Sequence, residues 1–526
     1  MAKIKKAWFC TACGNESAKW MGKCPACGEW NTMVEEIVSK ADEAVATSRN
    51  RAFIESSNPT PLPLSQISSS NENRITLSNS APENPEPKNS ELRNSELRNS
   101  ELKNSELDRV LGGGLVEGSL VLIGGEPGIG KSTLSLQIPL YCKHLKTLYV
   151  SGEESARQLK LRADRLASGM ASTAAASGIA TVPSTAAVSG TNSAASAGSA
   201  SDNCLILSET LLENILNQAK QVKPQLLIID SIQTIYSQNI ESSAGSVSQV
   251  RECAASLLRF AKESNTPVIL IGHITKDGSI AGPKVLEHIV DVVLQFEGDT
   301  RHSYRILRSI KNRFGSTAEL AVYEMTSQGL KEILNPSEMF IPMHENNLSG
   351  TAVAAMLDGT RPFLIEIQAL VSTAAYGTPQ RSATGFDVRR MNMLLAVLEK
   401  RVGFKLAQKD VFLNMAGGLK VSDPACDLAV VASILSSNFD VPLANDITFA
   451  GEIGLSGEIR PVSQIERRIT EAAKLGFRQI FVSSYSKIPS GLKNTQAGHN
   501  KTQAGHNNEI QIIEVANIQQ LVKAIF

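Results

Sequence analysis

Short aliphatic runs, each bounded by polar residues, recur through the middle of the chain at 120–123, 147–150, 226–229 and 268–271. Runs of this kind are typical of parallel strands that are buried on both faces of a sheet. The stretches between them, such as 132–145 and 247–264, carry apolar residues at helical spacing. This alternation predicts an α/β fold with a doubly wound parallel sheet.

From about residue 336 the pattern changes to shorter strands and helices in mixed order, which predicts a separate α+β domain. We expect a strand with a glycine turn, a hairpin and a helix at 410–420, 451–461 and 465–475. Arg467 and Arg468 are neighbours on this helix, and we interpret them as a cationic patch.

Three segments lack the composition of a packed core. Residues 38–106 are rich in Ser, Asn, Pro and Glu and contain a five-residue repeat, whose leucines fall on every fifth position from Leu92 to Leu107. That spacing matches neither a helix nor a strand. Residues 168–202 are almost all Ala, Ser, Gly and Thr, and 493–508 carry a second repeat. We interpret 38–106 as a linker and the other two as disordered insertions in surface loops.

Composition limits the binding partners and the cellular location that we expect for the protein. The chain has 526 residues with 52 Lys+Arg and 52 Asp+Glu, so contacts with nucleic acid or acidic lipid require local patches. No apolar run approaches the ~18 residues of a membrane span, and no hydrophobic signal segment follows the basic start. We expect a cytoplasmic protein without membrane contacts, with domains at 1–37, 107–335 and 336–526.

Four of the eight cysteines lie near the start of the chain as two C-x-x-C pairs, Cys10, Cys13, Cys24 and Cys27. Two such pairs bring four thiolates to the tetrahedral geometry that a structural Zn²⁺ prefers. Disulfides and a redox-active dithiol are the alternatives, and the cytoplasmic setting disfavours the former. Trp8, Trp20 and Trp30 are the only tryptophans, and we expect them to supply the small core of this ribbon. Five lysines of this segment could contact nucleic acid or a protein, or form a solvated basic face: Lys3, Lys5, Lys6, Lys19 and Lys23.

A phosphate-binding pattern, G-x-x-x-x-G-K-[ST], follows the first aliphatic run within Gly124-Gly125-Glu126-Pro127-Gly128-Ile129-Gly130-Lys131-Ser132-Thr133. The glycines let the backbone wrap around an anion, and the helix that follows adds the positive end of its dipole. Lys131 is expected to contact the β- and γ-phosphates, and the Ser132 hydroxyl to hold Mg²⁺. The sequence therefore predicts a site for ATP and Mg²⁺.

Carboxylates end two of the predicted strands, at the edge of the sheet where ligands bind in such folds. Asp230 follows the run 226–229 and is expected to orient Mg²⁺ or its waters. Glu153 is our candidate for activating or orienting the attacking water, whereas Glu154 could cap the next helix. His273 ends a further strand and could sense the γ-phosphate or serve a structural role.

Several motifs follow one another in a characteristic order. They are Leu107-Asp108-Arg109-Val110-Leu111-Gly112-Gly113-Gly114, the phosphate loop, Ser151-Gly152-Glu153-Glu154, Asp230-Ser231-Ile232-Gln233, Gly272-His273-Ile274-Thr275-Lys276-Asp277-Gly278 and Lys311-Asn312-Arg313-Phe314-Gly315. In this order they resemble the RadA (Sms) family of bacterial DNA-repair proteins, which are RecA-like ATPases. The resemblance covers nearly all of the chain outside the three low-complexity segments.

The resemblance gives roles to several basic residues. In RecA-like rings, cations such as Lys311 and Arg313 reach the ATP site of the next subunit, where they would stabilise transition-state charge. Contact with the DNA backbone is the alternative. Two residues apart on a strand, the two cations would share a face. The stretches 239–249 and 275–284 resemble the DNA-facing loops of such proteins. The cations available there are Lys276, Lys284 and, just beyond the first loop, Arg251.

The C-terminal domain resembles the proteolytic domain of Lon protease, which uses a Ser-Lys dyad. Ala425 stands at the position that resembles the nucleophile and Glu466 at the position that resembles the base. An alanine has no atom with which to attack, and we expect the adjacent Cys426 to point elsewhere. The resemblance therefore implies a scaffold that assembles rings and offers a basic surface to DNA. Lon-like domains pack as hexamers, so a homohexamer is implied.

The resemblance as a whole implies a DNA-dependent ATPase of homologous recombination and DNA repair, with ATP, Mg²⁺ and Zn²⁺ as cofactors. It would process single-stranded and branched DNA by branch migration and helicase-like unwinding, with the RecA recombinase as a partner. The alternatives are an ATP-dependent protease with a cryptic nucleophile and a RecA-like signalling kinase or clock-type ATPase. The kinase interpretation leaves the zinc ribbon without a role.

Overall fold

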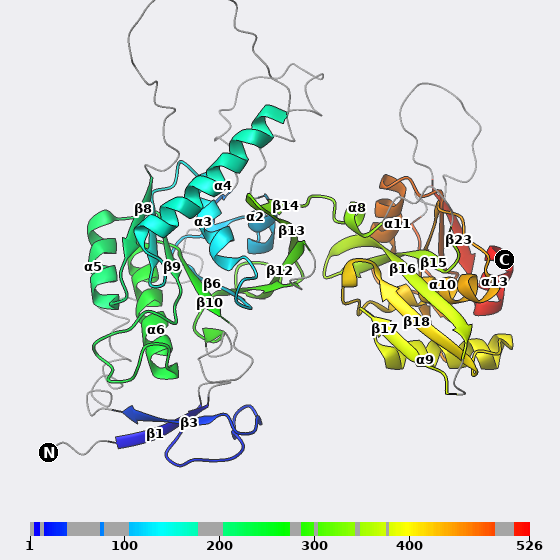
Figure 1. Ribbon diagram of the computed structural model, residues 1–526, viewed down its shortest axis with the longest axis horizontal. Coiled ribbons are helices and arrows are strands. Elements are labelled where there is room, and N and C mark those ends of the chain that lie inside the picture. The colour runs from blue at the N-terminus through cyan, green and yellow to red at the C-terminus, as the bar shows by residue number, and fades with distance from the viewer. Residues whose placement is uncertain are drawn as a thin grey trace, which may run out of the picture. The chain divides into compact units, whose positions relative to one another are not determined.

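The computed structural model describes residues 5–10, 15–38, 74–77, 105–176, 203–273, 286–298, 303–341, 348–374, 378–489 and 510–526. The chain divides into two compact units, Met1–Ile333 and Leu334–Phe526, and each is described by itself (Figure 1). Among the described residues, no helix combines the length and the apolar character needed to cross a membrane.

A nine-stranded sheet forms the centre of the first unit. Its strands are β6 (Leu120–Gly125), β7 (Thr147–Ser151), β8 (Cys204–Ser208), β9 (Leu226–Asp230), β10 (Val268–His273), β11 (Val292–Glu297), β12 (Tyr304–Asn312), β13 (Leu320–Thr326) and β14 (Gly329–Glu332). They are ordered β14-β13-β12-β11-β6-β10-β9-β7-β8. The strands from β11 to β8 in this order pair in parallel, and β12, β13 and β14 continue the sheet antiparallel. All four predicted aliphatic strands are confirmed.

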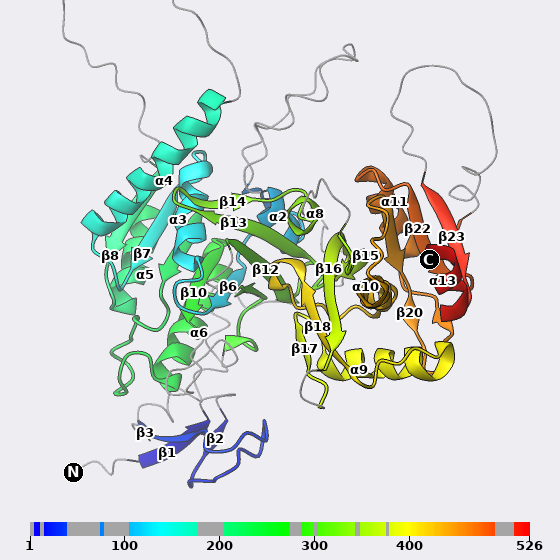
Figure 2. The same cartoon turned by 45° about the vertical axis from the view of Figure 1, so that its right-hand side comes forward.

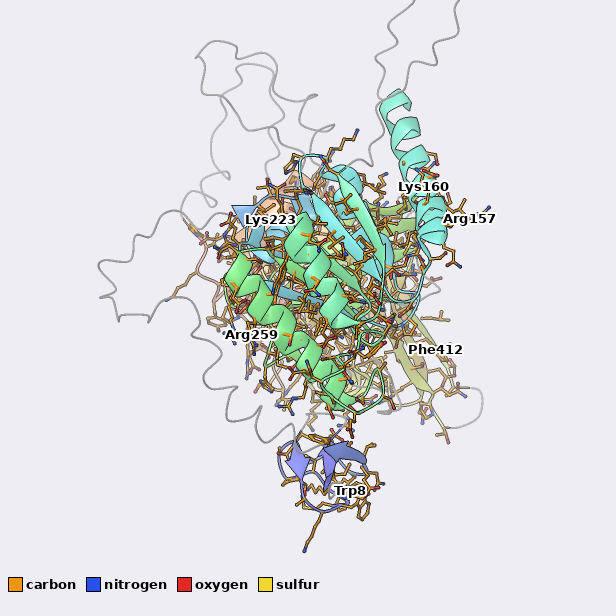
Figure 3. The ribbon with its side chains drawn as sticks, turned by 90° about the vertical axis from the view of Figure 1, so that its left-hand side faces the viewer. Trp8, Arg157, Lys160, Lys223, Arg259 and Phe412 are labelled. Atoms are coloured by element: carbon orange, nitrogen blue, oxygen red, sulfur yellow. The ribbon has the colours of Figure 1, made fainter. Side chains whose placement is uncertain are left out.

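Helices cover both faces of this sheet. They are α2 (Ser105–Leu111), α3 (Lys131–Tyr141), α4 (Ala156–Ala176), α5 (Leu212–Val222) and α6 (Val247–Ser264). Alternate strand residues point to opposite faces: Val121 and Ile123 pack with α2, α3 and α4, whereas Leu120 and Leu122 pack with α5 and α6. Figure 3 shows α5 and α6 side by side on their face of the sheet. The doubly wound architecture is thus confirmed.

Part of the segment expected to be linker belongs to this unit. β4 (Arg74–Ile75) pairs antiparallel with β5 (Leu115–Val116). Leu77 is fully buried, and its backbone N–H donates to Asp108 Oδ1 at 2.8 Å. The expectation of a continuous linker over 38–106 is therefore wrong at 74–77, because an isoleucine and a leucine there join the core of the sheet domain. α4 likewise runs to residue 176, into the expected insertion 168–202. The rest of that insertion and 493–508 lie outside the described residues.

The N-terminal ribbon is a small three-stranded antiparallel sheet. Its strands β1 (Lys5–Cys10), β2 (Glu16–Ser17) and β3 (Met33–Val38) are ordered β2-β1-β3. Trp8 pairs with Ser17 on one side and with Glu35 on the other.

The second unit is built on a seven-stranded mixed sheet. Its strands are β15 (Thr351–Asp358), β16 (Arg361–Thr373), β17 (Arg381–Thr384), β18 (Lys409–Met415), β19 (Ile447–Ala450), β22 (Gln479–Ser483) and β23 (Gln511–Val515), with a separate hairpin of β20 (Glu452–Ile453) and β21 (Ile459–Arg460). The helices are α8 (Ser337–Phe340), α9 (Val388–Val397), α10 (Asp427–Phe439), α11 (Ile465–Lys474) and α13 (Ile518–Ile525). α10 packs on β15 and β16 (Figure 2).

The three elements predicted for this unit are present. β18 is followed by Gly417 and Gly418, whose φ angles of 68° and 66° lie in the left-handed region that glycine tolerates best. β20 and β21 form the expected hairpin, and α11 is the expected helix. The secondary structure expected for these three segments is therefore confirmed.

Candidate nucleotide and metal sites

The loop between β6 and α3 has the backbone of an anion-binding turn. Gly125, Gly128 and Gly130 have φ angles of 155°, 76° and 119°. At Gly130 the φ angle itself disfavours a larger residue, and an added Cβ would also lie 2.8 Å from Met325 Cε, the end of a flexible side chain. A Cβ at Gly128 would meet nothing within 4 Å, so the loop is open on that side. The glycines thus serve both the turn and the free space above it.

Lys131 places its ammonium group inside this loop. The residue is only 3% exposed, and its Nζ donates to the carbonyl oxygens of Gly125 and Glu126, both at 2.9 Å. Burial lowers the pKa of Lys131 to about 8, while the negative charges of Asp230 and Glu153 oppose that change. The cation is held where a phosphate group would lie against the loop.

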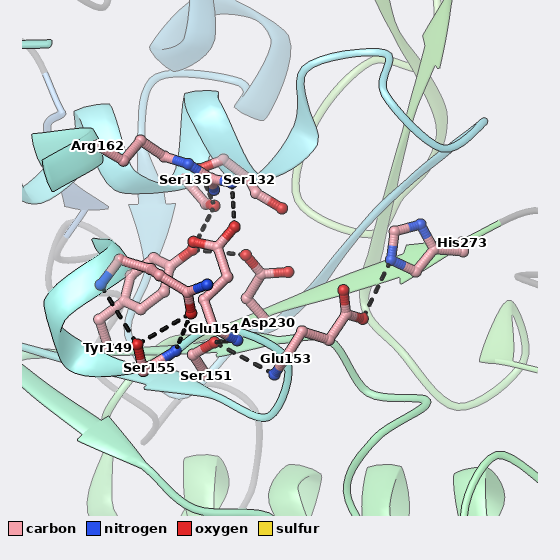
Figure 4. Close-up of polar contacts among 11 residues, drawn as sticks. Ser132, Ser135, Tyr149, Ser151, Glu153, Glu154, Ser155, Arg162, Asp230 and His273 are labelled. Carbon is pink, nitrogen blue, oxygen red and sulfur yellow. Dashed lines mark hydrogen bonds and ion pairs between the residues drawn. The ribbon is translucent and has the colours of Figure 1, made fainter. Parts of the chain in front are cut away.

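Asp230 is held by a tyrosine that the sequence analysis missed. The carboxylate is buried at the end of β9, and its Oδ2 accepts a hydrogen bond of 2.6 Å from the Tyr149 hydroxyl (Figure 4). The same hydroxyl lies 3.4 Å from Ser135 Oγ on α3. Burial and the Asp230 charge raise the pKa of Tyr149 well above its usual value, so the phenol remains a donor. The available signal was weak, because Tyr149 shares its strand with two other hydroxyl residues, Thr147 and Ser151.

Glu153 and His273 meet at the same edge of the sheet (Figure 4). Glu153 Oε1 accepts a hydrogen bond of 2.7 Å from Ser231 Oγ and lies 3.5 Å from His273 Nε2. Burial, and next the charge of Lys131, lower the pKa of His273, which favours the neutral imidazole at pH 7. Its Nδ1 has no hydrogen-bond partner among the described residues.

The neighbouring carboxylate, Glu154, has different partners. It pairs with Arg162 of α4, and its backbone N–H donates to Ser151 Oγ at 2.9 Å. Ser155 instead lies at the start of α4, where its hydroxyl bonds Gln158 Oε1 at 2.9 Å. Glu154 is therefore not the helix cap that it could have been, and Glu153 is the carboxylate beside Ser231 and His273.

Lys311 and Arg313 lie at the opposite end of the strands, beside the amino end of β6. Lys311 Nζ donates to the carbonyl oxygens of Glu287 and Val290 at 2.5 and 2.9 Å, and Arg313 Nε lies 3.8 Å from Asp291 Oδ1. Both cations thus contact one segment, although Arg313 lies just beyond the end of β12. The Asp291 N–H bonds the carbonyl of Leu120, the first residue of β6. The two cations are therefore separated from the phosphate loop of their own chain by the length of β6, which is about 17 Å at ~3.3 Å per residue.

The rest of the pentapeptide is anchored to the glycine motif at 112–114. Asn312 Nδ2 donates to the Leu111 carbonyl at 3.2 Å, and a Cβ at Gly315 would lie 3.2 Å from Gly112 Cα. This close approach explains why glycines are needed on both sides of the contact. Of the three candidate DNA contacts, Arg251 is exposed on α6, while Lys276 and Lys284 lie outside the described residues.

The ribbon brings three of its four predicted ligands together. The Sγ atoms of Cys10, Cys24 and Cys27 all lie within 4.8 Å of one another, and Cys13 falls outside the described residues. Thiolates at this spacing suit the tetrahedral coordination of Zn²⁺. The residues present therefore fit a structural zinc ion.

In the second unit, the two residues at the position that resembles the protease nucleophile lie below the surface. Ala425 and Cys426 are fully buried, and burial raises the pKa of the Cys426 thiol well above its usual value. Asp423 accepts a hydrogen bond of 2.6 Å from Arg468 Nη1, which also donates to the Ala355 carbonyl at 2.8 Å. Arg468 is only 1% exposed.

The predicted cationic patch of Arg467 and Arg468 is therefore wrong for Arg468. Neighbouring residues on a helix point about 100° apart, so the two side chains of α11 cannot share a face. Arg467 remains exposed and bonds the Thr360 carbonyl at 2.8 Å. Glu466, at the position that resembles the base, is exposed and lines a separate cavity with Tyr485.

Comparisons with known proteins agree with this layout. Residues 104–333 match the family described as the KaiC ATPase, 8–35 the rubredoxin metal binding domain and 371–486 the subunit ChlI of Mg-chelatase. The chain is 46% identical to the DNA repair protein RadA of Bacillus subtilis, over 92% of this chain and 93% of that protein. It is 47% identical to RadA of Listeria monocytogenes over the same shares. For RadA of Streptococcus pyogenes serotype M6 the identity is 40% over 100% of both chains.

Proposed function

The chain belongs to the RadA family of DNA repair proteins, and we propose that it is a DNA-stimulated ATPase that processes branched recombination intermediates. One observation carries the proposal. Lys131, Asp230 and Glu153 converge at the carboxyl ends of the parallel strands of one sheet, and each is held by a hydrogen bond of its own. Ligands of doubly wound sheets bind at this end of the strands.

The roles follow from the contacts. Lys131 and the backbone N–H groups of 124–133 bind the phosphates, and Ser132 and Asp230 hold Mg²⁺. When bound, the metal ion neutralises charge that develops on the phosphate oxygens. Glu153 orients the attacking water and accepts its proton, while Ser231 and His273 keep that carboxylate in place.

Lys311 and Arg313 act on the ATP of a neighbouring subunit. Their own phosphate loop lies at the other end of the strands, so they cannot serve it. In a head-to-tail ring, one surface of each subunit meets a different surface of the next. A homohexamer assembled in this way brings the two cations of one copy to the nucleotide of another, where they stabilise transition-state charge.

The substrate is single-stranded and branched DNA, with the RecA recombinase as partner and helicase-like branch migration as the outcome. Arg251, Lys276 and Lys284 supply local positive charge on a chain whose net charge is zero. The C-terminal domain serves as a scaffold rather than a protease, since Ala425 replaces the nucleophile and Cys426 is buried. The cytoplasmic location of the protein stays a prediction.

The decisive measurement is the ATPase rate of the full chain with and without single-stranded DNA at two salt concentrations. We expect stimulation that weakens with salt, because contacts to the DNA backbone release counterions. Lys131→Ala should abolish the rate in both conditions while leaving the circular dichroism spectrum unchanged. Hydrolysis that is indifferent to DNA, or that survives in Lys131→Ala, would refute the proposal.

A further inference from the structure

Two tryptophans of the ribbon lie on its surface. Trp20 and Trp30 are 56% and 67% exposed, whereas Trp8 packs against the buried Cys10 and Cys24. The expectation that all three rings form the core of the ribbon is therefore wrong for Trp20 and Trp30. Exposed apolar groups of this size, when they lie together, mark interaction sites.

The two exposed rings do lie together. A Cβ added at Gly22 would lie 3.6 Å from Trp20 Cη2 and 3.8 Å from Trp30 Cζ3. The backbone fixes this arrangement, because Asn31 N–H donates to the Gly22 carbonyl at 2.8 Å and Lys23 pairs with Trp30 in an antiparallel bridge. The turn between Lys23 and Trp30, which contains the second pair of cysteines, thus holds Trp30 close to the segment that carries Trp20. We call this surface the Trp20–Trp30 face.

Cations border this face. Lys23 Nζ lies 5.6 Å from the centre of the Trp30 ring. Lys19 is exposed directly before Trp20, in a turn where its N–H bonds Ser17 Oγ at 3.3 Å. Residues 19–31 contain these two lysines and a single carboxylate, Glu29. Flat rings edged by ammonium groups complement a ligand that offers both aromatic faces and negative charge.

We propose that the Trp20–Trp30 face stacks on unpaired bases of single-stranded DNA while Lys19 and Lys23 contact the flanking phosphates. Stacking of bases on aromatic rings tolerates any sequence, as repair requires. Base pairs in a duplex hide their faces, so the site prefers single strands. An apolar protein surface would fit less well, because both ammonium groups would lie beside it without a counterion. The inference rests on the proposed function in one respect, that the chain works on single-stranded DNA.

Fluorescence of the full-length, zinc-loaded chain tests this directly, since every tryptophan of the chain lies in the ribbon. Addition of a thymidine oligonucleotide should quench the tryptophan emission, and an equal amount of duplex should quench it much less. Unchanged emission at oligonucleotide concentrations that saturate the ATPase would overturn the inference.

Paired variants separate stacking from structure. The double variant Trp20→Leu/Trp30→Leu should bind a labelled oligonucleotide roughly tenfold more weakly, whereas Trp20→Phe/Trp30→Phe, which keeps the rings, should stay within about twofold of the unmodified chain. Zinc content is measured in both to show that the ribbon is intact. Equal affinity of the two double variants would refute stacking.

The ATPase separates this inference from the proposed function. If DNA stimulates hydrolysis but the tryptophans do not respond, the Trp20–Trp30 face is not a DNA site and the proposed function stands. If DNA neither binds nor stimulates, both proposals fall together.

Discussion

The nucleotide site of the first unit and the region around Ala425 in the second both contain several ionisable residues. The two regions differ in how far these side chains are paired with one another. At the nucleotide site, the Glu153 carboxylate contacts the Ser231 hydroxyl and the His273 imidazole but no cation closer than that imidazole among the described residues, and His273 Nδ1 has no hydrogen-bond partner there. Around Ala425, Asp423 is bound to Arg468 and Asp427 to Arg390. Groups poised for a ligand keep bonding capacity in reserve, whereas groups that have satisfied one another hold the fold together.

Glu153→Gln tests the first half of this comparison most strongly. An amide cannot accept the proton of the attacking water, so we expect the turnover number to fall a hundredfold or more, roughly the range of general base catalysis, with ATP affinity little changed. Glu154→Gln is the matched control, because Glu154 pairs with Arg162. Steady-state ATPase assays and nucleotide binding measure both. A larger loss of turnover in Glu154→Gln than in Glu153→Gln would show that Glu154, and not Glu153, activates the water.

Arg468→Met tests the second half. It removes the cation that faces the largely shielded carboxylate of Asp423, which keeps only its hydrogen bonds from the backbone N–H groups of Leu357 and Ala425. Breaking a buried ion pair typically costs about 3–5 kcal/mol of unfolding free energy. Calorimetry with added ATP, which shifts the transition of the first unit upward, isolates the transition of the second. Arg467→Met removes an exposed neighbour and should change the stability by less than about 0.5 kcal/mol. Equal effects would show that the buried pair contributes nothing special.

Tyr149→Phe removes one hydrogen bond to Asp230 and leaves the ring in the core. Hydrogen bonds to charged groups contribute about 1.5 kcal/mol or more, so the Mg²⁺ concentration for half-maximal ATPase should rise roughly tenfold. The rate should recover at saturating Mg²⁺, which a damaged fold would not allow. Tyr485→Phe, on an exposed tyrosine of the second unit, serves as the control. An unchanged Mg²⁺ requirement would show that Tyr149 does not position Asp230.

The smallest effect is the pH dependence of ATP binding. The pKa of Lys131 is about 8 without nucleotide because burial disfavours its charge, and a bound anion raises it again. Binding therefore takes up a proton above pH 8, and the affinity falls as pH rises, by about fourfold between pH 7 and 8.5. Lys131→Arg keeps its charge in this range, so its weaker affinity should be flat. A flat profile in the unmodified chain would contradict the assigned role of burial.

The sequence predicted the parts of the molecule that are set by local pattern. Aliphatic runs predicted the buried strands, and the glycines that a tight turn requires predicted the phosphate loop. The missed features are pairings between distant segments. Tyr149 and Asp230 come from neighbouring strands far apart in the chain, and Arg468 meets Asp423 across two elements. Residues 74–77 were misassigned because four ordered residues carry too little pattern to stand out from their surroundings.

The anchoring of β4 and Leu77 changes how the repeats before residue 105 act. Both ends of 78–104 are fixed on one domain, at Leu77 and at α2, so this stretch is a closed loop rather than a tether. Gain or loss of a five-residue copy then alters only the cost of loop closure, by roughly 0.2 kcal/mol. The copy number can therefore change without altering the contacts of β4, Leu77 and α2 that hold this part of the domain together.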